Sequence, residues 1–263
     1  MTDVEDRSLC LDPAPASDGA FARWLAGRAA ELLLKLRDEI GDADALRAAG
    51  DKRSHDLIVG ELARWRPADA VLSEEGTHDN PARLAADRVW IVDPLDGTRE
   101  YGEPGRTDWA IHIGLWAGRR LAAGAVALPA QHRVLGTDSP PAYPPLAGDR
   151  RTRLLASRTR PPAFLPALAA ELDAELVPMG SAGAKIAAVI TGDADAYVHA
   201  GGMYEWDSAA PVAVATATGL HASRLDGATL EYNLADPWLP DLVVCRKDLA
   251  PRLLAALTRI ERT

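Results

Sequence analysis

Hydrophobic positions recur at helical spacing near the start of the chain. Residues 1–16 carry two prolines and are expected to form a loose tail. Over residues 21–40 apolar side chains return every three or four positions, which predicts a long amphipathic helix. A less regular, acidic segment spans 41–52, and a second helix is predicted over 54–65.

Short apolar runs then alternate with turns. Residues 70–72 and 89–92 predict buried strands, while 109–116 and 121–128 predict a hairpin that turns at Gly118. Further elements are expected downstream, with strands over 153–156, 175–177, 195–199 and 242–245 and helices over 162–172, 184–190, 206–217 and 249–260.

Prolines between 140 and 145 predict a boundary between two halves, 1–148 and 149–263. We expect the two halves to form one functional unit with the active site between them. Strands alternate with helices and hairpins also occur, so we predict an α+β (α/β) fold of stacked sheets and helices.

Composition is ordinary for a globular enzyme, at 48% apolar and 25% charged residues in 263. The net charge of -9 argues against nucleic acid or an anionic membrane as a partner, because both favour a basic surface. A phosphate substrate stays compatible with this charge if a metal supplies local positive charge.

The two cysteines, Cys10 and Cys245, form no Cys-x-x-Cys pair. Two isolated thiols fit a reducing cytosol, although one disulfide stays open. The sequence shows neither a signal peptide nor an apolar stretch long enough to span a membrane. We therefore expect a cytoplasmic protein.

One stretch in the first half places carboxylates where a strand ends. The apolar run 89–92 breaks at Pro94 and Gly97, and Asp93 and Asp96 lie at that break. Hard cations such as Mg2+ prefer carboxylate and carbonyl oxygens, so the pattern predicts a cation site. A surface turn is the alternative, because Asp, Pro and Gly are common turn residues.

Two further acids repeat this arrangement. Glu74 follows the strand at 70–72, and Asp207 lies at the start of a helix of small residues. Carboxylates that gather repel one another, and a divalent cation relieves the repulsion. Taken singly, Glu74 could be a solvated loop acid and Asp207 a helix N-cap.

Two elements of the second half suit an anion. Gly180 and Ser181 introduce a helix whose N–H groups can bind a phosphate, and Lys185 lies one turn inside it. Ser157 and Arg158 add a hydroxyl and a guanidinium at a strand end. A solvated lysine and an ordinary basic loop are the alternatives.

Three motifs together resemble those of the inositol monophosphatase superfamily of Mg2+-dependent, lithium-sensitive phosphatases. Their order and spacing are as that family requires, and the resemblance covers nearly the whole chain. It implies a layered αβαβα sandwich and, commonly, a homodimer. The motifs are Leu72-Ser73-Glu74-Glu75, Asp93-Pro94-Leu95-Asp96-Gly97-Thr98 and Trp206-Asp207-Ser208-Ala209-Ala210.

The resemblance implies a role for each matching residue. Catalysis would use Asp51, Glu74, Asp96 and Thr98, with Thr98 and Glu74 activating a water. The N–H groups of Gly97 and Thr98 would hold the substrate phosphate. Two or three Mg2+ ions would be bound by Glu74, Asp93, the Leu95 carbonyl, Asp96, Asp207 and Asp51.

The chain departs from the family around Asp51, where Ala48 replaces the usual threonine and an upstream lysine is absent. The number of metal ions therefore stays open.

Within the superfamily, the chain resembles the CysQ-type phosphatases of 3'-phosphoadenosine 5'-phosphate (PAP). Ser157 and Arg158 look like part of their Ser-Arg-Ser element. Lys185 follows Gly180 and Ser181 where inositol phosphatases usually have an acid, and a lysine suits a second phosphate. Substrate contacts are thus implied for Gly97, Thr98, Ser157, Arg158, Gly180, Ser181, Lys185 and Asp207.

The implied reaction is hydrolysis of a small phosphate monoester, with PAP giving AMP and phosphate during sulfate assimilation; PAPS, the 5'-phosphosulfate counterpart of PAP, is a further substrate left open. An inositol-1-phosphatase, a fructose-1,6-bisphosphatase or an enzyme of mixed specificity is the nearest alternative, because the metal site is shared. A non-catalytic metal-binding protein is a second alternative.

Overall fold

The computed structural model describes residues 14–76, 81–145 and 150–260. The first of its two five-stranded sheets has the order β1-β2-β3-β4-β5. In this sheet β1 and β2 are parallel, and every other neighbouring pair is antiparallel. Its strands are β1 (Ala70–Ser73), β2 (Arg88–Asp96), β3 (Ala110–Ala117), β4 (Arg120–Leu128) and β5 (Arg133–Gly136).

The second sheet has the order β7-β6-β8-β10-β9. Strand β6 is parallel to both β7 and β8, whereas β10 is antiparallel to β8 and β9. Its strands are β6 (Thr152–Ser157), β7 (Ala174–Met179), β8 (Ala196–Tyr204), β9 (His221–Ser223) and β10 (Trp238–Cys245).

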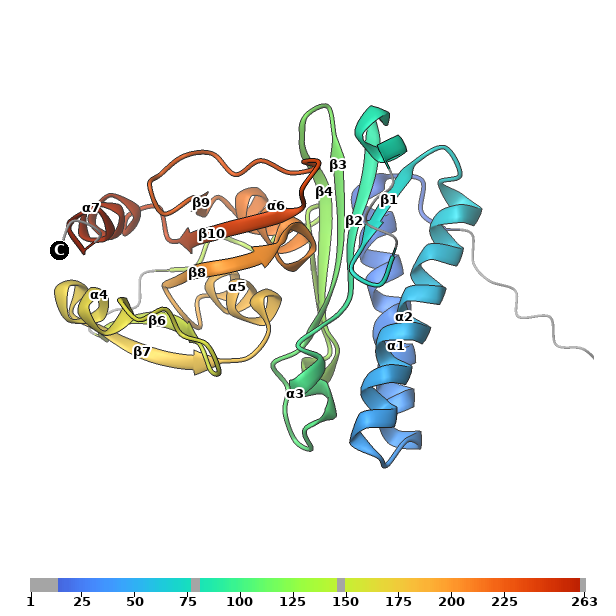
Figure 1. The fold of residues 1–263 in the computed structure, drawn as a ribbon, viewed down its shortest axis with the longest axis horizontal. Coiled ribbons are helices and arrows are strands. Elements are labelled where there is room, and N and C mark those ends of the chain that lie inside the picture. Colours follow the sequence, from blue (N-terminus) through green and yellow to red (C-terminus); the bar gives the residue numbers. More distant parts are fainter. Residues whose placement is uncertain (1–13, 77–80, 146–149, 261–263) are drawn as a thin grey trace, which may run out of the picture.

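Helices cover both outer faces and fill the space between the sheets (Figure 1). Helices α1 and α2 pack on the first sheet, α5 and α6 lie between the sheets, and α4 and α7 cover the second sheet. The predicted αβαβα sandwich is confirmed. The helices are α1 (Asp18–Glu39), α2 (Ala43–Trp65), α3 (Thr98–Gly102), α4 (Leu165–Leu172), α5 (Ala182–Thr191), α6 (Ala209–Thr218) and α7 (Ala250–Ile260).

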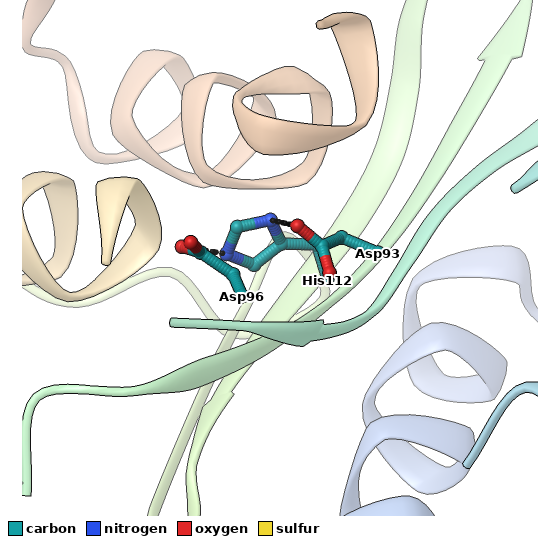
Figure 2. A group of neighbouring side chains, drawn as sticks. All are labelled: Asp93, Asp96 and His112. Carbon is teal, nitrogen blue, oxygen red and sulfur yellow. Dashed lines mark ion pairs between the residues drawn. The ribbon is translucent and has the colours of Figure 1, made fainter. Parts of the chain in front are cut away.

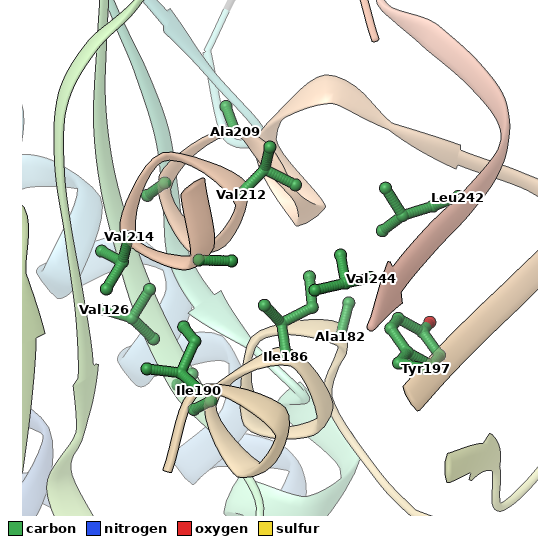
Figure 3. Close-up of a cluster of buried hydrophobic side chains, with 14 of the residues drawn as sticks. Val126, Ala182, Ile186, Ile190, Tyr197, Ala209, Val212, Val214, Leu242 and Val244 are labelled. Carbon is green, nitrogen blue, oxygen red and sulfur yellow. The ribbon is translucent and has the colours of Figure 1, made fainter. Parts of the chain in front are cut away.

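Alternation along the strands divides the interior into three apolar cores. In β2, Val89 and Ile91 face the middle core, while Trp90 faces the core under α1 and α2. This follows from the strand period of two, which sends successive side chains to opposite faces. Figure 3 shows the middle core, where Ile186 of α5 and Val212 of α6 lie among side chains from both sheets.

Most predicted helices and strands are present, but the start of the second helix was predicted wrongly. Helix α2 begins at Ala43, so the expected irregular segment over 41–52 is largely helical. Asp42 caps it by accepting a hydrogen bond from Ala45 N at 2.8 Å. From 43 to 53 only Leu46 and Gly50 are buried, so the segment lacks the apolar stripe that reveals a helix.

Three strand predictions also need correction. Strand β2 does not break at Pro94 but continues to Asp96, with a shift in its pairing register between Asp93 and Asp96. Strands β5 and β9 were missed, since runs of four and three residues carry little periodicity.

The strands of the first sheet lie within 70–136 and those of the second within 152–245. The expected division at 148 falls on 146–149, outside the described residues, and the two halves stay a prediction. Cys10 and most of the expected tail also lie outside, whereas Cys245 is a buried free thiol. Among the described helices, none is long and apolar enough to cross a lipid bilayer.

Candidate functional site

The end of β2 delivers the two aspartates that the sequence singled out. Asp93 lies opposite His112 of β3, and the register then shifts before Asp96 pairs with Ala110. Pro94 has no amide hydrogen to donate, which favours an irregular ladder at this point. Asp93 and Asp96 are only 1% and 8% exposed, so both charges lie largely out of water.

Gly97 turns the chain from β2 into α3. Its φ is +86°, in the left-handed region that favours glycine. A Cβ here would lie 3.1 Å from the Ser181 Cβ and 3.3 Å from the Trp109 Cα. Glycine therefore allows the close approach of three chain segments and leaves Thr98 as the first residue of α3.

His112 lies between the two aspartates and is fully buried (Figure 2). Its Nδ1 donates a hydrogen bond to the Trp206 carbonyl at 3.0 Å, and its Nε2 lies 3.3 Å from Asp96 Oδ2. The ligand atoms of Asp93, Asp96 and His112 are within 4.8 Å of one another, so the three side chains could hold a metal ion. The sequence analysis missed His112, whose signal is a polar residue inside the apolar strand β3.

Asp96 also caps α5. Its carboxylate accepts hydrogen bonds from Ser181 Oγ at 2.5 Å, Gly183 N at 2.6 Å and Ala182 N at 3.3 Å. Burial opposes its charge, but the nearby His112 ring and these donors lower the pKa of Asp96 to about 2. The anion at this helix start is thus a side chain of the protein, and substrate contacts at Gly180 and Ser181 stay predictions.

Three other acids repel one another across the site. Burial and the nearby Asp207 raise the pKa of Glu74 to about 7, and burial with Asp96 raises that of Asp207 to about 6. Burial and Glu74 raise the pKa of Asp93 well above its usual range. The Asp207 carboxylate accepts from Tyr204 N at 2.6 Å, and Ser208 is the N-cap of α6, so the N-cap alternative for Asp207 is wrong.

Asp51 reaches the site from the middle of α2. Its Oδ1 lies 3.2 Å from Thr98 Oγ1, which is also 3.1 Å from the Leu95 carbonyl. Burial and the charge of Glu75 raise the pKa of Asp51 to about 6. The structure therefore brings Asp51 and Thr98 together, as the resemblance implied.

A cavity of about 590 Å3 opens between the two sheets and gathers most of the predicted residues. Asp51, Asp93 and Leu95 lie beside it without lining it. The predicted residues that line it are Glu74, Asp96, Gly97, Thr98, Ser157, Arg158, Gly180, Ser181, Lys185 and Asp207.

The two cations proposed to bind a second phosphate are already engaged. Arg158 donates to Glu100 at 2.7 Å and to Glu103 at 2.9 Å. Lys185 is 4% exposed, and its Nζ donates to the Ser181 carbonyl at 2.7 Å and the Gly180 carbonyl at 2.9 Å. Burial lowers its pKa to about 8, so the alternative of a solvated lysine is wrong.

The sequence pattern of the inositol monophosphatase family matches residues 23–139 and 151–262. The chain belongs to the inositol monophosphatase family. This inositol monophosphatase family member is 50% identical over 260 residues to a 3'-phosphoadenosine 5'-phosphate phosphatase of Mycobacterium leprae, covering 94% of this chain and 96% of that protein. It is 32% identical over an alignment of 301 residues to the inositol-1-monophosphatase SuhB of Mycobacterium tuberculosis. The alignment covers 94% of this chain and 96% of that protein.

A solved structure shows that the fold, too, is that of the inositol monophosphatase family. The crystal structure of CysQ from Bacteroides thetaiotaomicron superposes with a TM-score of 0.72 at 26% identity, covering 86% of this chain and 96% of that one. The predicted family, fold and likeness to the CysQ-type branch are confirmed.

The inositol monophosphatase family is metal-dependent, and the residues of this member fit a divalent cation. Glu74, Asp93 and Asp207 are acids whose pKa values are raised by burial and by one another's charge. A bound cation would remove that repulsion, and carboxylate oxygens are the ligands that hard cations prefer.

Proposed function

We propose that this protein hydrolyses the 3'-phosphate of PAP to give AMP and phosphate. The observation that carries the proposal is the 50% identity to a PAP phosphatase over nearly the full length of both chains. The acidic cluster beside the cavity gives such a reaction its chemistry. A non-catalytic metal-binding role is disfavoured, since Glu74, Thr98 and Asp207 all line that cavity.

The acidic residues would hold Mg2+, as two or three ions. The proposed ligands are Glu74, Asp93, the Leu95 carbonyl, Asp96, Asp207 and, for a third ion, Asp51. When bound, the metal supplies positive charge that lowers the pKa of a water and neutralises charge on the phosphoryl group.

Thr98, Asp51 and Glu74 would orient the attacking water. The Thr98 hydroxyl lies 3.2 Å from Asp51, and the carboxylate of Asp51 or Glu74 would accept the proton that the water loses. The water oxygen forms a bond to phosphorus, the bond to the 3'-oxygen breaks, and that oxygen takes up a proton as AMP leaves. The amides of Gly97 and Thr98 would hold the transferred phosphoryl group.

The remaining proposed contacts lie on the second-sheet side of the cavity. Arg158 could bind the 5'-phosphate by exchanging its partners Glu100 and Glu103 for the phosphate. Lys185 would contribute positive charge from beneath the Gly180–Ser181 turn, where its Nζ is held by backbone carbonyls.

We further propose a cytoplasmic homodimer that lithium inhibits and that removes PAP during sulfate assimilation. These properties are supported by the family resemblance and by the isolated thiols.

Product analysis tests the proposal. With PAP and Mg2+ we expect adenosine 5'-phosphate and an equal amount of phosphate, separated by chromatography, and no turnover after chelation of the metal. Glu74→Gln serves as the inactive control. Formation of adenosine 3'-phosphate, or no turnover at all, would contradict the proposal.

A second candidate function is inositol-1-phosphate hydrolysis. It is favoured by the 32% identity to an inositol-1-monophosphatase over the same share of this chain. Fructose-1,6-bisphosphate hydrolysis and mixed specificity follow the same reasoning, because the metal ligands do not depend on the leaving group.

A further inference from the structure

The cavity that holds the acidic cluster has an aromatic rim, formed by Tyr204 and Trp238. These residues end β8 and begin β10, where they pair directly across the two strands. Their exposures are 42% and 44%, although large apolar side chains usually gain by burial. Exposed aromatic surface that lines a cavity is a common mark of a ligand-binding face.

The rim is packed against neighbouring residues. The Tyr204 ring stacks on the buried Trp206 ring at 4.6 Å and 11°, and Trp238 meets Tyr204 edge-on at 5.3 Å and 82°. Gly202 lies under Trp238, since a Cβ there would come within 1.6 Å of the indole Cζ2, and its φ is +91°. The indole therefore packs against Tyr204 and the backbone of Gly202, while 44% of Trp238 stays open to the solvent.

The rim is also fixed relative to the reacting centre. Tyr204 N donates to the Asp207 carboxylate at 2.6 Å, and Trp206 accepts from His112 through its carbonyl at 3.0 Å. The segment 204–207 thus joins the aromatic rim to the acidic cluster over four residues. A ligand whose phosphate lies at the acids therefore has this aromatic wall among the surfaces within the same cavity.

We propose that Trp238, supported by Tyr204, is the platform on which the purine base of the substrate stacks. The inference rests on the proposed PAP hydrolysis and names the part of the cavity that distinguishes a nucleotide from a sugar phosphate. Flat π-systems stack on Trp and Tyr, and stacking adds affinity for any base without hydrogen-bond readout. Inositol and fructose phosphates have no flat π-system, so they lack this stacking contribution.

The test compares two ligands that differ only in the base. Calorimetric titration with AMP and with ribose 5-phosphate, both in Mg2+, should show tighter binding of AMP to the wild type. Trp238→Ala should weaken AMP binding by about 5- to 100-fold and leave ribose 5-phosphate unchanged, while Trp238→Phe keeps most of the preference. Leu84→Ala is the matched control, because Leu84 is equally exposed at 44% and lies outside this cavity.

Several outcomes would overturn the platform. The first is equal affinity of the wild type for AMP and ribose 5-phosphate. The second is an equal loss of affinity for both ligands in Trp238→Ala. The third is a change of oligomeric state in that variant with no change in its preference for AMP. PAP turnover is measured separately. Absent PAP turnover with an intact, Trp238-dependent preference for AMP would defeat the proposed function and leave the platform standing.

Discussion

At the scale of single residues, two carboxylates of the site are shifted in opposite directions. Burial and Asp207 raise the pKa of Glu74 to about 7, whereas the donors around Asp96 overcome burial and lower its pKa to about 2. A carboxyl group whose pKa is raised by folding stabilises the fold only while it is protonated, and this stability is lost as the pH rises through the raised pKa. A carboxyl group whose pKa is lowered by folding stabilises the fold at any pH above the pKa it has in the unfolded chain. Above neutral pH, charged Glu74 therefore destabilises the metal-free protein and charged Asp96 stabilises it.

Neutralising each acid should accordingly change stability with opposite sign. Without metal at about pH 8, Glu74→Gln should raise the free energy of unfolding by up to about 1 kcal/mol, because solvent screening limits the effect. Asp96→Asn should lower it by about 2 kcal/mol, since Ser181 and the first amides of α5 lose a charged acceptor. Chemical denaturation measures both, and a loss of stability in Glu74→Gln would contradict the assignment of repulsion.

His112 should position the metal ligands. His112→Ala removes the contact to Asp96 and the hydrogen-bond donor to the Trp206 carbonyl. The Mg2+ concentration that gives half-maximal activity should therefore rise about 10- to 100-fold. Mg2+ titration of phosphate release measures this. His221→Ala is the control, because His221 contacts Ser223 on β9, outside the cavity. An unchanged Mg2+ requirement in His112→Ala would remove the positioning role.

Sequence reasoning found the acids of the site but not the state of its basic residues. Asp93, Asp96 and Glu74 follow apolar runs beside Gly or Pro, so their placement can be inferred locally. The burial of Lys185 depends on the turn of β7 into α5 and on the Tyr197 ring 5.0 Å away. Such contacts join segments distant in the chain, and no local pattern encodes them.

At the scale of elements, α2 approaches the site through Gly50. A Cβ at Gly50 would lie 2.7 Å from Tyr101 Cε1 and 2.9 Å from Leu95 Cδ2, so only glycine permits this contact between α2, α3 and β2. The contact brings the next residue, Asp51, to Thr98. The periodicity that predicts helices reports an apolar face, and here the buried position has no side chain at all.

Two glycines of the same helix should therefore respond differently to alanine. Gly50→Ala should destabilise the protein by about 1–3 kcal/mol through overpacking and should lower activity by displacing Asp51. At Gly60 a Cβ would have no neighbouring atom within 4 Å, so Gly60→Ala should stabilise by about 0.5–1 kcal/mol. Thermal unfolding and phosphate release measure the pair, and equal effects at both positions would contradict the tight contact at Gly50.

At the scale of the whole molecule, the layers could be predicted while their contacts could not. Alternation and helical spacing predict two sets of strands and helices, but the placement of α5 and α6 between the sheets comes from packing of distant segments. Gly114 and Gly124 show this, because a Cβ at either would lie 3.1 Å or less from an atom of α6. The sequence around each glycine gives no sign of this contact and predicts only a strand.

The acidic cluster should couple metal binding to global stability in a pH-dependent way. Asp51, Glu74 and Asp207 have raised pKa values of about 6 to 7, so the stability they contribute is lost as pH rises through that range. Mg2+ competes with protons for these acids, and its stabilisation should be larger at about pH 8 than at about pH 5. Melting curves with NaCl at matched ionic strength provide the control, and equal Mg2+ shifts at both pH values would contradict the coupling.

The most direct measurement is phosphate release in Mg2+ with PAP, inositol-1-phosphate and fructose-1,6-bisphosphate in parallel, compared by kcat/KM. If the cavity serves a nucleotide, kcat/KM for PAP should exceed the values for both sugar phosphates by at least about 100-fold, as a specific base contact allows. Values for the sugar phosphates equal to or above that for PAP would contradict the account and would indicate a sugar phosphatase with the same metal site.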